Sequence, residues 1–179
     1  MVPGKEKKTF RKLDLKNDQL NYTFTYNDEE TKALHEKLNG ASSITIDDLR
    51  RISLWKLGRV MSVPDETLQK LVELSNNKNV RIDDNSVKVV LECLVESQGI
   101  GFPMASAILK FINPGVFPII DVRAYRALTG KKPDSSTYSY NKYIEYSKEL
   151  AKIADSTERP LREIDEQLYC FDKKQNGKI

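Results

Sequence analysis

The sequence has few of the side chains that bind metals or form disulfides. It contains one histidine, His35, and two cysteines, Cys93 and Cys170, with no partner at metal-ligand spacing. Their number excludes a four-cysteine iron–sulfur cluster, and a single histidine does not make a zinc site. We therefore expect no metal, interpret both cysteines as reduced core thiols, and assign no chemistry to His35.

Long apolar runs are also missing. No stretch approaches the roughly 20 apolar residues that span a bilayer, and the run 116–120 contains Pro118. The N-terminus carries no apolar block behind its first charged residues, so it lacks the pattern of a secretory signal. We expect a chain without a membrane partner, located in the cytoplasm or at the nucleoid of a bacterium.

What the sequence does have is an ordinary globular composition with an uneven distribution of charge. The 179 residues suit one domain or two small lobes. Hydrophobic residues at 39% and charged residues at 31% are ordinary for a globular protein. Residues 1–16 hold six basic and two acidic side chains, whereas residues 17–179 hold 23 basic and 24 acidic ones. The basicity is thus an N-terminal arm, which is typical both of nucleic-acid binding and of solubilising tails.

The pattern after the arm is almost entirely helical. Alternating aromatic and polar residues over 20–26 predict a short extended segment. Capping residues and apolar spacing then predict an all-α fold of about eight helices. Their expected ranges are 28–39, 45–57, 62–76, 84 to the turn at Gln98, 102–112, 121–129, 139–155 and 159–172. We expect an arm with the extended segment at 1–26, a helical domain at 27–172 and a basic tail at 173–179.

Apolar residues at helical spacing indicate which faces are buried. The expected inward positions are Leu49, Ile52, Trp55, Leu68, Leu71, Val72, Val87, Val90, Leu91, Leu94 and Val95. Four tyrosines near the C-terminal helices, Tyr138, Tyr140, Tyr143 and Tyr146, are likewise interpreted as core residues.

The most informative stretch joins two apolar helices through Gln98-Gly99-Ile100-Gly101. Two glycines around one apolar residue allow a sharp turn while Ile100 enters the core. The amides of the turn and of the next helix's first residues would then point outward at the positive end of the helix dipole, where a phosphate binds favourably. The pattern predicts a helix-hairpin-helix, with a plain helical hairpin and glycine C-cap as the alternative.

The residues after the hairpin extend this pattern. Asp121 follows Pro103 by eighteen residues at the end of an apolar run containing Phe117-Pro118, and Arg126 follows on the next helix. Residues 91–130 thereby resemble the helix-hairpin-helix DNA glycosylase superfamily, in particular the endonuclease III and adenine glycosylase group. The resemblance implies a compact version of that fold and a DNA base-excision repair enzyme. Asp121 would be the carboxylate that stabilises the oxocarbenium-like sugar and activates water.

Several positions depart from the family pattern. Bifunctional members carry a nucleophilic lysine where this chain has Pro103, so the resemblance implies a monofunctional glycosylase without lyase activity. Ser97-Gln98 replaces the usual Leu-Pro, and Arg123 replaces a frequent histidine. An aspartate at a helix start is also an ordinary N-cap, so a non-catalytic DNA-binding relative and a helical protein-interaction module remain alternatives.

The resemblance assigns the remaining site residues. We expect a monomeric protein whose partner is duplex DNA. The resemblance implies no cofactor other than a possible monovalent cation bound by the hairpin carbonyls. Trp55 and Tyr125 are candidates for a base pocket, although a lone tryptophan on an apolar helix face is more often a core residue. The candidate DNA-binding residues are Gln98, Gly99, Ile100, Gly101, Phe102, Pro103, Met104, Lys110, Arg123 and Arg126, of which Lys110, Arg123 and Arg126 could instead be solvated or ion-paired.

Overall fold

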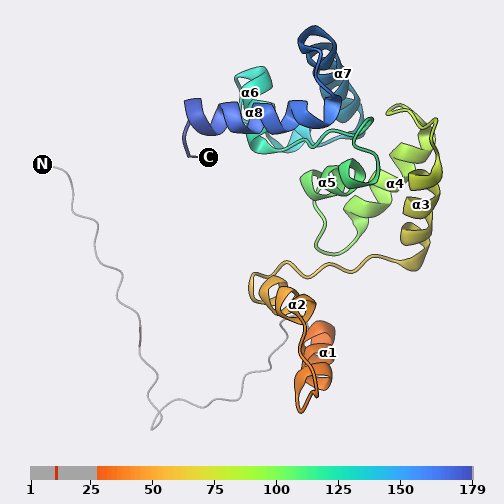
Figure 1. Cartoon of the computed structure of the whole chain (residues 1–179), viewed down its shortest axis with the longest axis vertical. Coiled ribbons are helices and arrows are strands. Elements are labelled where there is room, and N and C mark those ends of the chain that lie inside the picture. The colour runs from red at the N-terminus through yellow and green to blue at the C-terminus, as the bar shows by residue number, and fades with distance from the viewer. Residues whose placement is uncertain (1–10, 12–27, 179) are drawn as a thin grey trace, which may run out of the picture. The chain divides into compact units, whose positions relative to one another are not determined.

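The structure, a computed structural model, describes Arg11 and residues 28–178 (Figure 1). The described residues form eight α-helices and one short 3-10 helix, so the all-α prediction is confirmed. The arm, apart from Arg11, and the extended segment 20–26 lie outside the described residues. The helices are α1 (Asp28–Leu38), α2 (Ile46–Lys56), α3 (Asp65–Asn76), α4 (Asn85–Glu96), α5 (Phe102–Ile112), α6 (Val122–Thr129), η1 (Ser135–Thr137), α7 (Tyr140–Thr157) and α8 (Leu161–Gln175).

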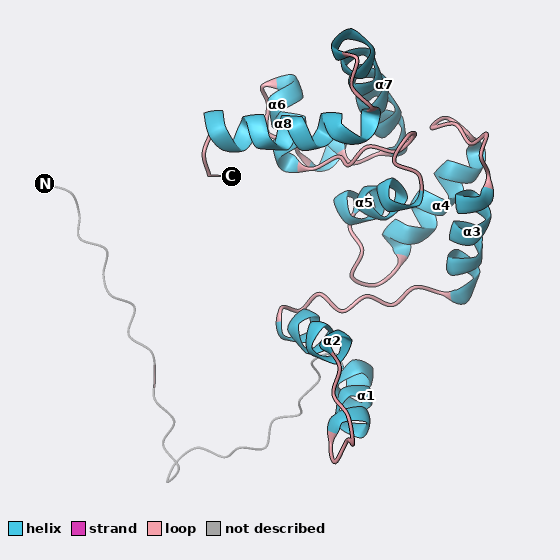
Figure 2. Ribbon diagram, viewed as in Figure 1, coloured by secondary structure: helices cyan, strands magenta, loops and turns pink. Residues whose placement is uncertain are grey.

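The chain divides into two compact units after Gly58. Helices α1 and α2 belong to the first unit, and α3 to α8 belong to the second. The domain expected over 27–172 therefore contains two units, and α8 continues three residues into the expected tail. Within the described part, only helices and loops are drawn (Figure 2), and none of these helices is long and apolar enough to cross a membrane.

The described part of the first unit is a pair of helices stabilised by polar contacts. Thr45 and Asp48 form the predicted capping box of α2, and the buried Asp48 carboxylate also pairs with Lys37. The hydrogen bond from Lys37 holds the pKa of Asp48 well below its usual range. Leu49 is exposed within this unit, contrary to the prediction, because it lies about 100° around α2 from the buried Asp48. Ile52 lies one turn after Asp48 on the same face and lines a pocket together with Trp55, although 37% of its surface is exposed.

The second unit has its hydrophobic core around α4. Val87, Val90, Leu91 and Leu94 are buried as predicted. Val95 is exposed because it lies about 100° around the helix from Leu94. Leu68 and Val72 are also exposed, contrary to the prediction, because the buried face of α3 runs through Thr67 and Leu74 instead. Further core residues come from α5, α7, α8 and the link before α6, among them Ala105, Leu109, Phe117, Ile120, Tyr143, Leu150 and Ile164.

The C-terminal helices enclose the link between α5 and α6. Helix α8 lies alongside α6, and α7 packs against α8 (Figure 1). Gly130 ends α6 in the left-handed conformation, at φ 69°. This arrangement brings side chains of α5, α7 and α8 around residues 117–121, where the sequence predicted the catalytic carboxylate.

Candidate nucleic-acid and catalytic site

The turn at residues 97–101, called the hairpin below, joins the packed helices α4 and α5. Gly99 has a φ of +78°, which is a left-handed conformation that side chains disfavour. Ile100 is only 5% exposed and belongs to the core, as predicted. The phenyl ring of Phe102 is also buried and meets Tyr143 edge-on at 5.9 Å between ring centroids. Ile100 and Phe102 therefore anchor the hairpin, and only their backbone atoms are candidates for contact with DNA.

Gly99 is required by a close approach within the protein. A Cβ atom at Gly99 would lie 2.3 Å from the carbonyl oxygen of Val60. The chain beside it is held by a hydrogen bond of 3.1 Å from the Ser62 amide to the Gln98 carbonyl. One side of the hairpin is thus covered by residues 60–62. The glycine at 99 is explained by the fold, whatever the hairpin binds.

Gly101 has open surroundings. It is the N-cap residue of α5, has an ordinary extended φ of −91°, and no side chain caps the helix there. A Cβ atom at Gly101 would have only the Pro103 Cδ atom within reach, at 4.0 Å. The amides of the first helical turn, among them that of the exposed Met104, have no intrahelical acceptor. This end of α5 can therefore receive an anion.

Residues 117–120, called the clamped segment below, are held through their backbone by three helices. The Pro118 carbonyl accepts a hydrogen bond of 2.7 Å from the Tyr143 hydroxyl, and the Ile119 carbonyl accepts one of 2.9 Å from the Tyr146 hydroxyl. The Ile119 amide donates to Asp165 Oδ2 at 2.7 Å, and the Ile120 amide donates to Ser106 Oγ at 3.2 Å. Side chains thus replace the partners that a sheet would supply to an extended segment.

Asp121 stands directly after the clamped segment. It is the N-cap of α6, and its Oδ1 accepts the Ala124 amide at 2.7 Å. The side chain is half-buried. The structure therefore shows the N-cap role that was one interpretation of this residue. This role leaves the second carboxylate oxygen available, so it is compatible with the catalytic interpretation.

A pocket of about 280 Å³ opens beside this carboxylate. It is lined by Ile119, Asp121, Asp165, Glu166, Tyr169 and Cys170. Three of the six lining residues are acidic, and Lys110 pairs with two of them, Asp165 and Glu166, at 2.7 and 2.8 Å. Burial lowers the pKa of the Lys110 ammonium, but these two hydrogen bonds outweigh it and the net pKa is raised.

The pairing of Lys110 changes its expected role. Its side chain is 8% exposed and its ammonium group is bound by two carboxylates. A lysine that is buried and neutralised in this way is not accessible to a DNA phosphate. The prediction of a phosphate contact from Lys110 is therefore corrected to an internal ion pair between α5 and α8.

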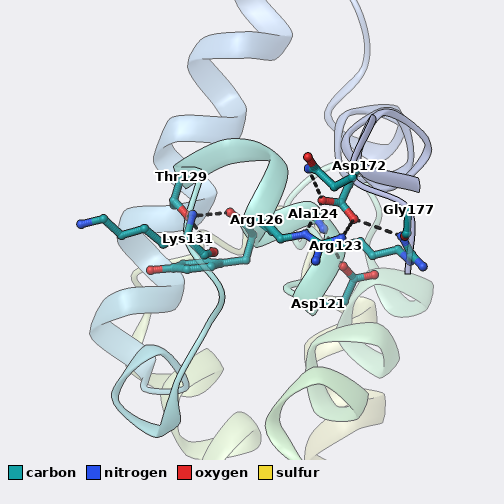
Figure 3. A network of polar contacts seen from close by, with 10 residues as sticks. Asp121, Arg123, Ala124, Arg126, Thr129, Lys131, Asp172 and Gly177 are labelled. Atoms are coloured by element: carbon teal, nitrogen blue, oxygen red, sulfur yellow. Dashed lines mark hydrogen bonds and ion pairs between the residues drawn. The ribbon is translucent and has the colours of Figure 1, made fainter. Parts of the chain in front are cut away.

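Arg123 and Arg126 are engaged in a second internal network (Figure 3). Both guanidinium groups point to the fully buried Asp172 of α8, which Arg126 binds through two hydrogen bonds of 2.6 and 2.7 Å. Arg123 donates to Asp172 at 3.1 Å and to the Gly177 carbonyl at 2.8 Å. The hydrogen bond from Arg126 holds the pKa of Asp172 well below its usual range. Both arginines connect α6 to α8, which is the ion-paired alternative given above.

Comparisons with known proteins found no relative of this chain. No protein-family model, curated protein or solved structure matches the chain. The resemblance to helix-hairpin-helix glycosylases therefore stays a prediction that depends on the residues themselves.

The two candidate base-pocket residues lie in different units. The Trp55 indole donates to Thr31 Oγ1 at 2.8 Å and lines a pocket of about 530 Å³ between α1 and α2. Tyr125 belongs to the second unit, one turn after Asp121, and its ring stacks on Tyr146 with centroids 6.4 Å apart. Both contacts are ordinary packing, and the base-pocket role of these residues stays a prediction.

Four residues hold the clamped segment in a role that was not predicted from the sequence: Ser106, Tyr143, Tyr146 and Asp165. Both tyrosines were predicted as core residues, and they are buried. A signal existed for the tyrosines, because buried tyrosine hydroxyls normally need a hydrogen-bond partner. Burial and the charges of nearby carboxylates raise the pKa of both phenols, so they remain neutral donors. Asp165 directly follows Ile164 on the inward face of α8, and a carboxylate there also indicates a buried partner.

The cysteine and cation predictions have separate outcomes. Cys93 and Cys170 are free, but Cys93 is only half-buried and Cys170 is exposed, so the core interpretation was wrong for Cys170. No group of metal-binding side chains occurs among the described residues. The hairpin carbonyls of Ser97, Gln98 and Gly101 each accept one backbone amide, and the monovalent cation stays a prediction.

Proposed function

We propose that this protein is a monofunctional DNA glycosylase, which binds duplex DNA at the hairpin and hydrolyses the N-glycosidic bond of a flipped, damaged or mismatched base. The observation that carries the proposal is the hydrogen bond from the Ile120 amide to Ser106 Oγ. Ser106 belongs to the helix that begins at the hairpin, and Ile120 is the residue before Asp121. This hydrogen bond thus connects the helix that begins at the proposed phosphate-binding end to the residue before the proposed catalytic carboxylate.

The separation along α5 suits this chemistry. Ser106 follows the N-cap Gly101 by five residues, which corresponds to about 7.5 Å of helix rise. One nucleotide of a DNA strand advances about 3.4 Å along the duplex axis. Ser106, which contacts the residue before Asp121, therefore lies about two nucleotide rises from the hairpin end along the axis of α5.

The reaction needs one negative charge at Asp121. As the bond between C1′ and the base breaks, its electron pair leaves with the base, and positive charge develops on the sugar. The carboxylate oxygen not bound to Ala124 stabilises that charge and accepts a proton from the attacking water, whose oxygen forms the new bond to C1′. The departing base acquires a proton from the solvent. Pro103 has no amine for imine formation, so the abasic strand stays intact.

The test is base release from a panel of lesion-bearing duplexes, followed by alkaline cleavage of abasic sites. Asp121→Asn should slow single-turnover release by at least about 10²-fold, because asparagine keeps the cap but carries no charge and accepts no proton from water. Asp134→Asn is the matched control, since Asp134 is also an N-cap aspartate that accepts a backbone amide, at Ser136. It should release the base at the wild-type rate.

Two results would oppose the proposal. Equal release by wild type and Asp121→Asn on a confirmed substrate would remove the catalytic assignment. Duplex binding without release of any lesion in the panel would favour the non-catalytic DNA-binding relative, in which Asp121 only caps α6.

A second candidate function is a helical protein-interaction module. Phe111 of α5 is 86% exposed within the described structure, and it would support a partner surface if it formed part of a contiguous apolar patch. The cations expected at DNA, Lys110, Arg123 and Arg126, are also paired internally. Absence of any salt-dependent duplex binding by the full chain would favour this module over both DNA-binding functions.

A further inference from the structure

The buried carboxylate of Asp165 is not used by the proposed reaction, yet it contacts the chain two residues before Asp121. Its side chain is 2% exposed. Oδ1 accepts from the Lys110 ammonium at 2.7 Å and from the Glu166 amide at 3.0 Å, whereas Oδ2 accepts the Ile119 amide at 2.7 Å. Each oxygen therefore has a different task, one in charge neutralisation and one in holding the backbone.

Charge neutralisation makes the backbone contact possible. An unpaired carboxylate in the protein interior is costly, and Lys110 supplies the opposite charge at hydrogen-bond distance. The ammonium group is in turn shared with Glu166, whose side chain is 62% exposed. This arrangement leaves Oδ2 of Asp165 as a charged acceptor for Ile119, and hydrogen bonds to charged groups are stronger than neutral ones.

The contact holds the backbone two residues before Asp121. The Ile119 residue is held on its amide by Asp165 of α8 and on its carbonyl by Tyr146 of α7. Both Asp165 and Asp121 line the same pocket. Without the bond from α8, the peptide at 119 could rotate, and the rotation would be passed through Ile120 to the carboxylate.

We propose that Asp165 is a positioning residue, which fixes the orientation of the Asp121 carboxylate through the Ile119 amide. The inference rests on the proposed function for its kinetic consequence, whereas its structural consequence can be measured without any substrate. Displacements of about 1 Å at a reacting group can cost about 10²-fold in rate.

The decisive pair of variants is Asp165→Asn and Glu166→Gln. Each removes one negative charge from the pocket and leaves an amide oxygen that can still accept from Lys110, but only Asp165 contacts Ile119. In Asp165→Asn the amide NH₂ must face either Lys110 or the Ile119 amide, and both are donors. Since Lys110 needs the remaining oxygen, the bond to Ile119 is lost.

The first measurement is backbone amide hydrogen exchange in the full chain without DNA. Asp165→Asn should accelerate exchange at Ile119 and also at Ala124, whose amide reports the contact with Asp121. Glu166→Gln should leave both amides protected. Loss of protection at Ile119 with full protection at Ala124 would overturn the positioning role, even if the protein turned out to have no glycosylase activity.

The second measurement is single-turnover base release on the substrate found in the panel. Asp165→Asn should lower the rate about 10- to 100-fold with duplex affinity within about twofold of wild type, and Glu166→Gln should lower it far less. Equal loss in both variants would mean that the charge of the pocket matters and the backbone contact does not. No release by wild type would refute the glycosylase, and the exchange result would then decide the positioning role by itself.

A double variant covers the case in which Asp165→Asn does not fold. Lys110→Met with Asp165→Leu removes both buried charges together, so no ammonium group is left unpaired, while Ile119 still loses its acceptor. It should reproduce the faster exchange at Ile119 and Ala124. A folded double variant with wild-type exchange at Ala124 would contradict the proposal.

Discussion

Replacement of Gly99 by alanine tests the close approach between the hairpin and residues 60–62. Alanine at φ +78° is strained by about 1–2 kcal/mol relative to glycine. Its Cβ atom would also lie 2.3 Å from the Val60 carbonyl oxygen, so one of the two backbone segments must move. The movement breaks the hydrogen bond from the Ser62 amide to the Gln98 carbonyl, which contributes about 1 kcal/mol. We expect Gly99→Ala to lower the free energy of unfolding by about 2–3 kcal/mol.

Two other glycines separate these contributions. Gly130 has a similar φ of +69° but no atom within 4 Å of its Cβ position, so Gly130→Ala should show the conformational strain alone. Gly101→Ala has neither strain nor crowding and should cost about 0.5 kcal/mol as a poorer N-cap. All three changes restrict the unfolded chain equally, so that effect cancels in the comparison.

The assay is urea denaturation followed by far-ultraviolet circular dichroism, since the single tryptophan, Trp55, lies in the first unit and the three glycines lie in the second. The expected order of destabilisation is Gly99→Ala, then Gly130→Ala, then Gly101→Ala. If Gly99→Ala costs no more than Gly130→Ala, residues 60–62 do not pack on the hairpin and the reasoning fails. Of the two hairpin glycines, only Gly101 can be replaced without a collision between the new Cβ atom and the backbone, so Gly101→Val is the variant to use for testing DNA binding.

Three further predictions concern the arm, Pro103 and Asp172. Deletion of residues 1–19 should flatten the salt dependence of duplex binding, and an unchanged slope would identify the arm as a solubility tail. Borohydride added during turnover should trap no covalent protein–DNA adduct, because Pro103 has no amine; a strong adduct would reveal a lysine nucleophile elsewhere. The depressed pKa of Asp172, caused chiefly by Arg126, means that this carboxylate stabilises the fold above its unfolded pKa of about 3.9 and loses that contribution as the pH falls further. Asp172→Asn should therefore lower the urea midpoint at pH 7. It should also make the urea midpoints at about pH 7 and pH 3 more alike than they are in the wild type, and an unchanged difference between these midpoints would show that Asp172 does not govern acid sensitivity.

The helices were predictable because local signals agree with the fold. Thr45 and Asp48 formed the expected capping box, and helix α5 was predicted with the bounds that it has. The face that each helix buries was less predictable, since it depends on where neighbouring helices lie. Leu68 and Val72 have the spacing of a buried stripe, but the contacts of α3 lie on the side of Thr67 and Leu74.

The candidate site was only partly predictable for a similar reason. Asp121 and the hairpin belong to one short sequence motif, so the sequence pointed to both of them. Asp165 and Asp172 come from α8, more than forty residues after Asp121, and no local pattern connects them to the site. Charge alone could not distinguish a phosphate-binding lysine from one paired inside the protein. Lys110 became assignable only when α8 was seen to bring two carboxylates to its ammonium group.

The clamped segment also affects which mutations the protein can tolerate. Its hydrogen bonds use the peptide groups of residues 118–120, so those bonds do not depend on which side chain stands at the half-buried Ile119. Proline is the exception there, since it would remove the amide. The bonds depend instead on the side chains that make them, which lie on three separate helices: Ser106, Tyr143, Tyr146 and Asp165. Mutational drift near Asp121 should thus be permitted at position 119 and restricted at these distant positions, a pattern that a comprehensive substitution library of the second unit would reveal.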